Sequence, residues 1–163
     1  MTAVVEPLGR VIALGAGDAD RYCDHLMRLD EPSRKMRFFA EMSEFHLLFH
    51  AGAALSDGRI VVGYVEADEV RGACELLVTD RDAHRAEAAF SVETEWRCRG
   101  IGGLLMTAMI DHARRLAIRH IEMSCLRSNL PMQALAARFT ADLRQVGETA
   151  LAVLDNSDAA SPA

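Results

Sequence analysis

The stretch of residues 90–116 constrains the fold of this chain more than any other part of the sequence. An apolar strand ending near Val92 is followed by a charged turn, by the glycine-rich loop of residues 97–103 and at once by a long amphipathic helix. Closely spaced glycines let backbone N–H groups face a ligand without a Cβ in the way, and the positive end of the helix dipole lies behind them. The order of strand, loop and helix therefore predicts a site for a phosphate-bearing ligand.

Two other phosphate-binding loops do not fit these residues. A Walker loop needs Lys followed by Ser or Thr after its last glycine, whereas Gly102 is followed by Gly103 and Leu104. The dinucleotide fingerprint needs a third glycine at the position that Leu105 occupies. What remains is Arg-x-x-Gly-x-Gly between a strand and a long helix. A glycine-rich turn that only tightens this junction is the alternative interpretation.

With this loop the sequence resembles the GNAT superfamily of N-acetyltransferases, in which the same motif grips the pyrophosphate of acetyl-CoA. The specific part of the resemblance covers residues 86–136. Residues 29–39, with Ser-Arg-x-x-Arg-Phe-Phe, are also similar to the start of the GNAT domain in bacterial protein-lysine acetyltransferases. The resemblance implies that acetyl-CoA is the co-substrate and that it is bound by Phe90, Ser91, Val92, Arg97, Cys98, Arg99, Gly100, Ile101, Gly102, Gly103 and Asn129.

Acetyl transfer to an amine needs a base, because an amine with a pKa near 10.4 is neutral in only about one molecule in 2,500 at pH 7. Glu87 is the candidate, since it is the lone charge in the strand at residues 86–92 and lies three residues before Phe90. In the protein-lysine acetyltransferases that Ala-Glu-Ala-Ala-Phe resembles, a Glu here is the proposed base. Glu75 on the neighbouring strand is the reserve candidate, and an ordinary solvent-facing glutamate is the alternative for Glu87.

Two features of the family pattern are missing from the end of the chain. Many members protonate the leaving thiolate with a Tyr seven residues after the Asn of the last helix, and counting from Asn129 gives Ala136. The usual Gly-Phe after this helix is replaced by Thr140 and Ala141. A thiol with a pKa near 8.5 leaves without full acid assistance, so the missing Tyr affects the rate more than the type of reaction. Asn129 is explained equally well as a helix cap.

The pattern of apolar residues and turns predicts an α+β fold. The resemblance implies a central mixed, mostly antiparallel twisted sheet with helices on both faces. The helix from Ile101 should cover the sheet with Leu105, Met109, Ala113 and Leu116. We expect strands at 10–14, 59–66, 70–78, 86–92, 120–126, 143–146 and 149–154, and helices at 19–29, 33–55 with a break near Met42, 101–116 and 129–140.

Composition limits the class of protein. The 163 residues fit one domain, expected over residues 1–155, with a fraying tail at 156–163. Half the residues are hydrophobic, but no apolar run approaches the roughly 18 residues of a membrane span, and no leader is evident, so a cytoplasmic protein is expected. The net charge of −6 argues against nucleic acid as a partner. His46 and His50 lie four apart without a third ligand, so we expect no metal site.

The sequence thus predicts an acetyl-CoA-dependent N-acetyltransferase that acts on a primary amine, either a protein lysine or a small molecule. A non-catalytic acyl-CoA-binding sensor of the same fold is the alternative, favoured by Ala136. Cys98, between two arginines near a helix N-terminus, raises the hypothesis of redox or acylation sensing, with an unreactive loop cysteine as the alternative. The resemblance also allows a homodimer, because GNAT proteins often form dimers.

Overall fold

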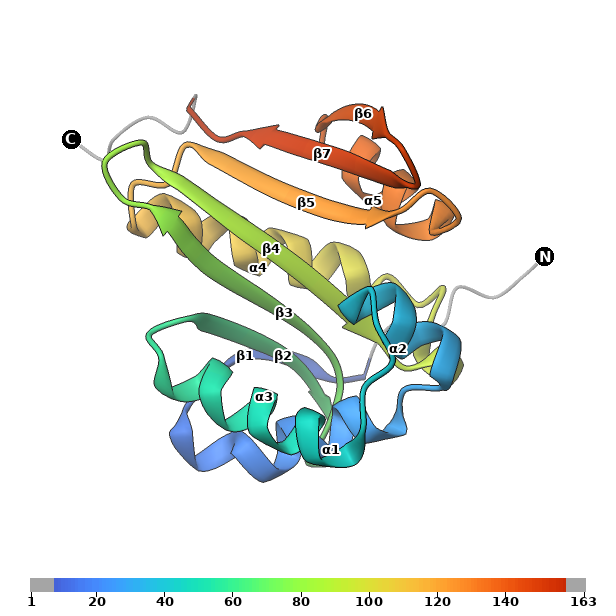
Figure 1. Cartoon of the computed structure of the whole chain (residues 1–163). Helices are drawn as coiled ribbons and strands as arrows, with labels where there is room; N and C mark the ends of the chain where they lie inside the picture. The colour runs from blue at the N-terminus through green and yellow to red at the C-terminus, as the bar shows by residue number, and fades with distance from the viewer. Residues whose placement is uncertain (1–7, 158–163) are drawn as a thin grey trace.

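The computed structural model describes residues 8–157, which build one seven-stranded sheet in the order β1-β2-β3-β4-β5-β7-β6 (Figure 1). Every neighbouring pair is antiparallel except β4 and β5, which run parallel. The strands are β1 Arg10–Leu14, β2 Ile60–Glu66, β3 Glu69–Asp80, β4 Arg85–Val92, β5 His120–Leu126, β6 Asp142–Val146 and β7 Thr149–Asp155.

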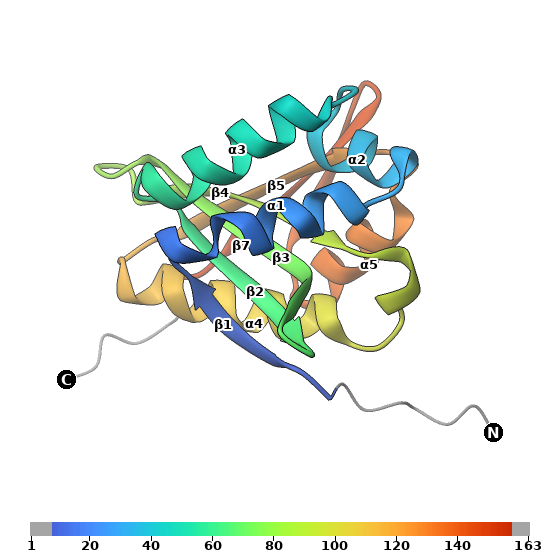
Figure 2. The same cartoon turned by 90° about the horizontal axis from the view of Figure 1, so that it is seen from below.

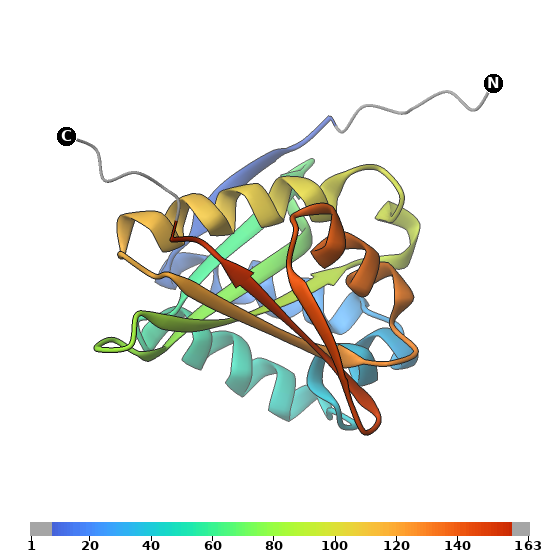
Figure 3. The ribbon, with the colours of Figure 1, turned by 90° about the horizontal axis from the view of Figure 1, so that it is seen from above.

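Helices cover both faces of the sheet (Figures 2 and 3). One face carries α1, α2 and α3, and the other carries α4 and α5. The helices are α1 Ala19–Arg28, α2 Glu31–Phe38, α3 Glu44–Ser56, α4 Ile101–Arg115 and α5 Leu130–Arg138. The predicted fold class, a mixed and mostly antiparallel sheet between two helical layers, is confirmed.

The sheet has a separate hydrophobic core on each face, because successive residues of a strand point to opposite sides. On β3, Cys74 belongs to the core under α4, while its neighbour Ala73 belongs to the core under α1 and α3. The α4 core contains Leu105, Met109 and Ile121 among others. Because each face of the sheet carries a core, β2 is apolar on both faces, which is why it reads as a nearly continuous apolar run.

The two parallel strands separate soon after they begin. Residues 85–87 of β4 pair with residues 120–122 of β5, and from there the strands diverge, as Figure 1 shows. The narrow end is fastened by the His84 carbonyl, which accepts the N–H groups of Arg119 (2.8 Å) and His120 (3.1 Å). We call the diverging pair the strand fork. It opens toward the end of the sheet at which α2 lies.

The structure refines three predictions from the sequence. β3 continues to Asp80, beyond the expected end at residue 78, because Asp80 still pairs with Arg85 across a tight turn. Leu116 caps α4 and is 42% exposed, so it does not join the buried side of that helix. Asn156, expected in the fraying tail, is buried and donates to the Ile118 carbonyl (3.1 Å). The remaining tail at 158–163 lies outside the described residues.

Replacement of Leu105 by Ala tests the packing of α4. Leu105 is fully buried in the core under α4, so its truncation should cost about 2–5 kcal/mol of unfolding free energy. The adjacent Leu104 is 40% exposed, and Leu104→Ala should stay within about 0.5 kcal/mol of the unmodified protein. Urea unfolding of both variants measures the difference, and equal costs would contradict the assigned face of the helix.

Candidate functional site

Backbone groups at the end of β4 point into the strand fork. Glu93 donates its N–H to the Arg71 carbonyl (3.0 Å), so it faces β3. In an antiparallel pair the residues that face the partner strand alternate, and Ser91 therefore faces β3 as well. The N–H and C=O groups of Phe90 and Val92 face the opposite way, toward β5, which pairs only with residues 85–87. An extended ligand could take the place of the missing strand here.

The glycine-rich loop presents further N–H groups beside the open end of the fork. Gly100 adopts a left-handed conformation (φ 79°) and ends the loop, and the N–H of Leu104 is the first to bond back into α4, to the Gly100 carbonyl at 3.1 Å. The N–H groups of Ile101, Gly102 and Gly103 thus have no partner within the helix. A Cβ on Gly102 would lie 3.2 Å from Leu135 of α5, so glycine also permits close packing of the two helices.

The two loop arginines have different surroundings. Arg97 turns away from the loop, since its Nε donates to the Val92 carbonyl (3.1 Å) and its NH2 group to Ser33 Oγ of α2 (2.8 Å). Arg99 stays with the loop, where it donates to the Glu95 carbonyl (3.0 Å) and stacks on Trp96 at 4.7 Å. Cys98 between them is exposed, with a left-handed backbone (φ 59°).

The side chain of Ser91 is part of a buried network that the sequence did not suggest. Its Oγ lies 2.8 Å from His25 Nε2, and His25 Nδ1 lies 3.1 Å from a carboxylate oxygen of Glu93. Burial lowers the pKa of His25, so the ring is neutral and Nδ1–H donates to Glu93 while Nε2 accepts from Ser91. Arg28 (2.9 Å) and Arg71 (3.0 Å) complete the contacts of Glu93. The network holds α1 against the C-terminal end of β4.

The contacts of Glu93 also explain its charge. Burial alone would raise the pKa of this carboxyl, but the hydrogen bonds from His25, Arg28 and Arg71 together lower it. The order serine, histidine and carboxylate is the order of a hydrolase triad. Here, however, His25 is fully buried, and both the backbone and the side chain of Ser91 point away from the fork. Ser91, predicted to contact the donor, is therefore flanked by the two residues that face the fork.

Glu75, the reserve candidate for the base, lies at the centre of a second buried cluster. Its carboxylate contacts the Tyr22 hydroxyl, His50 Nε2 (2.6 Å), Arg37 (3.0 Å) and Arg59 (3.5 Å). Burial raises the pKa, but His50, Arg37 and Tyr22 outweigh it and lower the pKa from 4.5 to about 2. A carboxylate held so firmly ionised is a poor proton acceptor near neutral pH. Glu75 instead joins α1, α2, α3 and the residue before β2 to β3.

Glu87 lies at the point where the fork begins. It is exposed, occupies the last paired position of β4 opposite Glu122, and shares the α1 and α3 face with Ala89. Among residues 8–157 it has no ion-pair partner, whereas Glu122 pairs with Arg85 at 3.7 Å. An exposed carboxylate with no cation beside it remains free to accept a proton at the fork.

Other predicted positions have mainly structural roles. Asn129 caps α5, because its Oδ1 accepts the N–H of Met132 (3.2 Å). Ala136, at the position of the family tyrosine, is 1% exposed and packs into the core. His46 contacts Ser43 and His50 contacts Glu75, so the two histidines have separate partners.

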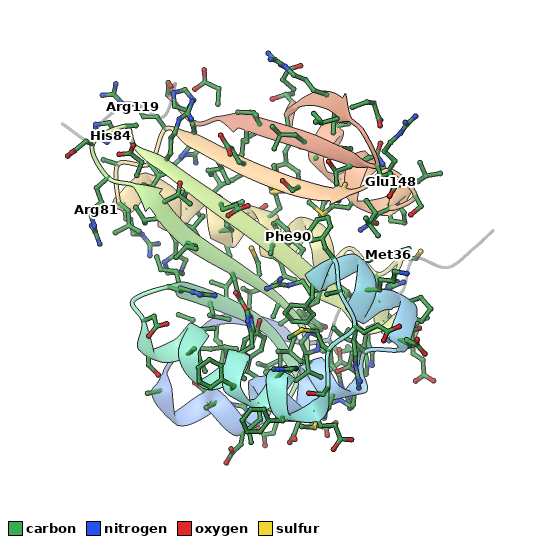
Figure 4. The ribbon with its side chains drawn as sticks, viewed as in Figure 1. Met36, Arg81, His84, Phe90, Arg119 and Glu148 are labelled. Atoms are coloured by element: carbon green, nitrogen blue, oxygen red, sulfur yellow. The ribbon has the colours of Figure 1, made fainter. Side chains whose placement is uncertain are left out.

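A pocket of about 520 Å³ lies at the open end of the fork. Its walls are Pro32, Lys35 and Met36 of α2, residues 126–128 at the end of β5, and Glu148 in the turn between β6 and β7. Figure 4 shows Phe90 in the fork, with Met36 and Glu148 on either side of the open end. A second pocket, of about 840 Å³, runs along α3 beside His46, Phe49, His50 and Arg59.

Comparison with known proteins gives the family. Residues 19–140 match the acetyltransferase (GNAT) family. The chain therefore belongs to the GNAT acetyltransferase family, whose reaction is acetyl transfer from acetyl-CoA, and the predicted family is confirmed. No curated protein matches the sequence. No helix among residues 8–157 has the length and apolar character needed to cross a membrane.

Solved structures of low sequence identity share the fold. The GNAT domain of S. lividans PAT has 18% identity and a TM-score of 0.80 over 90% of both chains. A phosphinothricin acetyltransferase from Sinorhizobium meliloti, solved in complex with AcCoA, has 14% identity and a TM-score of 0.71, with 95% of this chain and 93% of that chain covered. An N-acetyltransferase from Staphylococcus aureus Mu50 has 13% identity and a TM-score of 0.72, with 91% and 99% covered.

The Glu75 cluster makes a prediction about acid stability. Because the pKa of Glu75 is lowered on folding, its contribution to stability is complete above its usual value of 4.5 and is lost as the pH falls toward 2. Glu75→Gln should cost about 3–5 kcal/mol at pH 7, since it leaves Arg37 buried without its counter-charge. The stability difference between the variant and the unmodified protein should shrink between pH 4.5 and pH 2.

Urea unfolding at pH 7 and at pH 3 measures this difference. Glu148→Gln is the matched control, because Glu148 is exposed and should change stability by less than about 0.5 kcal/mol at either pH. A cost for Glu75→Gln that is the same at pH 3 as at pH 7 would contradict the assignment of an ionised, paired Glu75.

Proposed function

We propose that this protein transfers an acetyl group from acetyl-CoA directly to a primary amine. The observation that carries the proposal is the backbone of Phe90 and the N–H of Val92, which have no strand partner in the strand fork and lie beside the free N–H groups at the start of α4. The first can pair with an extended amide chain and the second with a pyrophosphate. Both features of a CoA thioester thus meet complementary groups on adjacent segments of the chain.

Backbone groups of β4 would also take part in the reaction. A free N–H at Phe90 can donate to the thioester oxygen as negative charge develops on it. One well-placed donor of this kind contributes about 2.7–4 kcal/mol in other enzymes. The network of Ser91, His25 and Glu93 holds the strand immediately after Phe90 and so helps to fix the direction of that N–H.

Glu87 is the proposed base. It shares a face of the sheet with the helices that border the fork, and no cation among the described residues competes for its carboxylate. A proton from the amine would pass to Glu87 directly or through water. Since Ala136 supplies no acid, the leaving thiolate would take a proton from solvent.

The acceptor is left at the level of a primary amine. The resemblance of residues 29–39 to bacterial protein-lysine acetyltransferases supports a protein lysine, whereas likeness to the phosphinothricin acetyltransferase supports a small molecule. We also propose that the chain forms a single domain and that the protein is cytoplasmic. Four free cysteines agree with a cytoplasmic location. The homodimer and the contact of Asn129 with the donor also stay proposals.

Donor binding is tested by calorimetric titration with acetyl-CoA. The unmodified protein should bind, and Gly102→Glu should not, because the new carboxylate adds bulk against Leu135 and negative charge beside the pyrophosphate. Gly17→Glu is the matched control, since a Cβ there meets nothing within 4 Å and should leave binding intact. No binding by the unmodified protein would contradict the proposed donor site.

Glu87→Gln tests the base. The turnover number should fall by about 10²–10⁴-fold while the affinity for acetyl-CoA is retained, because only the proton transfer is lost. Glu122→Gln, on the paired strand, is the control and should keep most of the activity. Full activity of Glu87→Gln with every amine acceptor would contradict this role.

The non-catalytic sensor is the second candidate, and Ala136 is the observation that favours it. It requires donor binding without transfer to any amine. The same titration combined with a screen of amines separates the two, because a sensor would bind acetyl-CoA with no release of free thiol.

A further inference from the structure

Lys35 is the only lysine among the 18 lysine and arginine residues of the chain. Arginine supplies every other fixed positive charge. A guanidinium stays protonated in proteins and is not an acceptor of acetyl groups under mild conditions, whereas a lysine amine is. Apart from the N-terminus, the chain thus offers one primary amine, and the structure places it at the open end of the strand fork.

The position of Lys35 is fixed by the contacts of α2. Asp30 caps the helix by accepting the N–H of Ser33 (2.8 Å), and it also accepts the Thr94 hydroxyl (2.8 Å) of the segment after β4. Arg97 of the glycine-rich loop donates a hydrogen bond to Ser33 Oγ (2.8 Å). These bonds hold α2 against the segment that leads from β4 into the glycine-rich loop, so α2 cannot move away from the fork without breaking them.

The side chain of Lys35 borders the pocket at the open end of the fork. The opposite wall is the end of β5, with Leu126 and Arg127. Lys35 itself is exposed, and among residues 8–157 no carboxylate lies within ion-pair distance of its ammonium. A lysine amine on its four-carbon stem reaches on the order of 6 Å from the backbone. The amine therefore borders the open end of the fork, and no carboxylate of the described residues holds it in an ion pair.

We infer that Lys35 is a modification site, acetylated by the chain in its own fork. The inference rests on the proposed function, since it uses the same donor site and the same base. It goes further by naming an acceptor within the protein. The placement of the chain's only lysine at the entrance of the acetyl-transfer site carries the inference.

The reaction balances without any further reagent. The neutral Nζ of Lys35 attacks the thioester carbonyl carbon, so one C–N bond forms and the C–S bond breaks. Nζ loses one proton to Glu87 or to water, and the CoA thiolate gains one from solvent. If the amine starts as an ammonium ion, one additional proton is released. The products are an acetyl-lysine amide and free CoA thiol.

Acetylation would change the charge at the entrance of the pocket. Lys35 loses its positive charge, which leaves Arg127 and Glu148 as the charged groups of the walls. An amine acceptor that carries an acidic group would then meet one cation instead of two. Modification of Lys35 would in this way alter which acceptors can bind.

Mass spectrometry tests the inference on the full chain. Incubation with acetyl-CoA alone should add one acetyl group, located at Lys35 by peptide mapping. The fraction of protein labelled per unit time should not depend on protein concentration, because the reaction takes place within one chain. Lys35→Arg keeps the charge and removes the amine, so its peptide should stay unmodified while the variant still binds acetyl-CoA. Glu87→Gln should slow labelling of Lys35 by the same factor as it slows turnover of free amines.

Arg114→Lys in the Lys35→Arg background is the matched control for chemical acetylation. Arg114 is half-exposed near the end of α4, about 20 Å along the helix from the donor loop. A lysine there should label at least ten-fold more slowly than Lys35. Equal rates of labelling of the two lysines would overturn the inference. So would a fraction of Lys35 labelled per unit time that rises in proportion to protein concentration.

The remaining outcomes separate the inference from the proposed function. Turnover of free amines with no label on Lys35 would overturn the inference and leave the proposed function standing. Failure of both, in a protein that binds acetyl-CoA, would favour the sensor and overturn both proposals together.

Discussion

The separation of β4 from β5 is the constraint on which the site depends. Where two parallel strands stay paired, every backbone group between them is used, and no ligand can be added. Here pairing ends after residues 87 and 122, so Phe90 keeps free N–H and C=O groups and Val92 a free N–H in the middle of a sheet, while the Val92 carbonyl accepts from Arg97. The bonds of the His84 carbonyl to the start of β5 keep the narrow end closed, and α2 borders the wide end.

Buried charges stabilise the segments around this opening. One cluster, centred on Glu93, joins α1 and β3 to the end of β4, and the other, centred on Glu75, joins three helices to β3. Both carboxylates are surrounded by arginines from different elements. Removal of one partner would leave a buried charge unpaired. The loss of such a contact therefore costs more stability than the loss of apolar packing of the same size. The fork is thus bordered by segments whose relative positions are well determined.

The sequence predicted most of the fold because its signals are local. Turn residues and apolar periods located nearly every strand and helix, and the loop motif identified the family that the comparisons confirm. The ends of elements were less predictable, since Asp80 extends β3 only through its pairing with Arg85. Asn156 could not be assigned to the fold because its partner, Ile118, is far away in the sequence.

The same distinction between local signals and distant partners applies to the candidate site. The loop residues and Glu87 could be chosen from spacing and resemblance, and they stay predictions for the site. The roles of Arg97, His25 and Glu75 could not be predicted, because each depends on partners brought together by the folded chain. The sequence contains Lys35 as its single lysine, but the significance of that lysine depends on where α2 places it.

Residue-resolved amide hydrogen exchange, measured by NMR with and without acetyl-CoA, tests the central claim most directly. The account predicts that the donor slows exchange at Phe90 and Val92 in the fork and at Ile101, Gly102 and Gly103 at the start of α4. The amides of β6, the edge strand that is separated from β5 by β7, should be unchanged. Unaltered exchange at Phe90 and Val92 in a protein that binds acetyl-CoA would contradict the account.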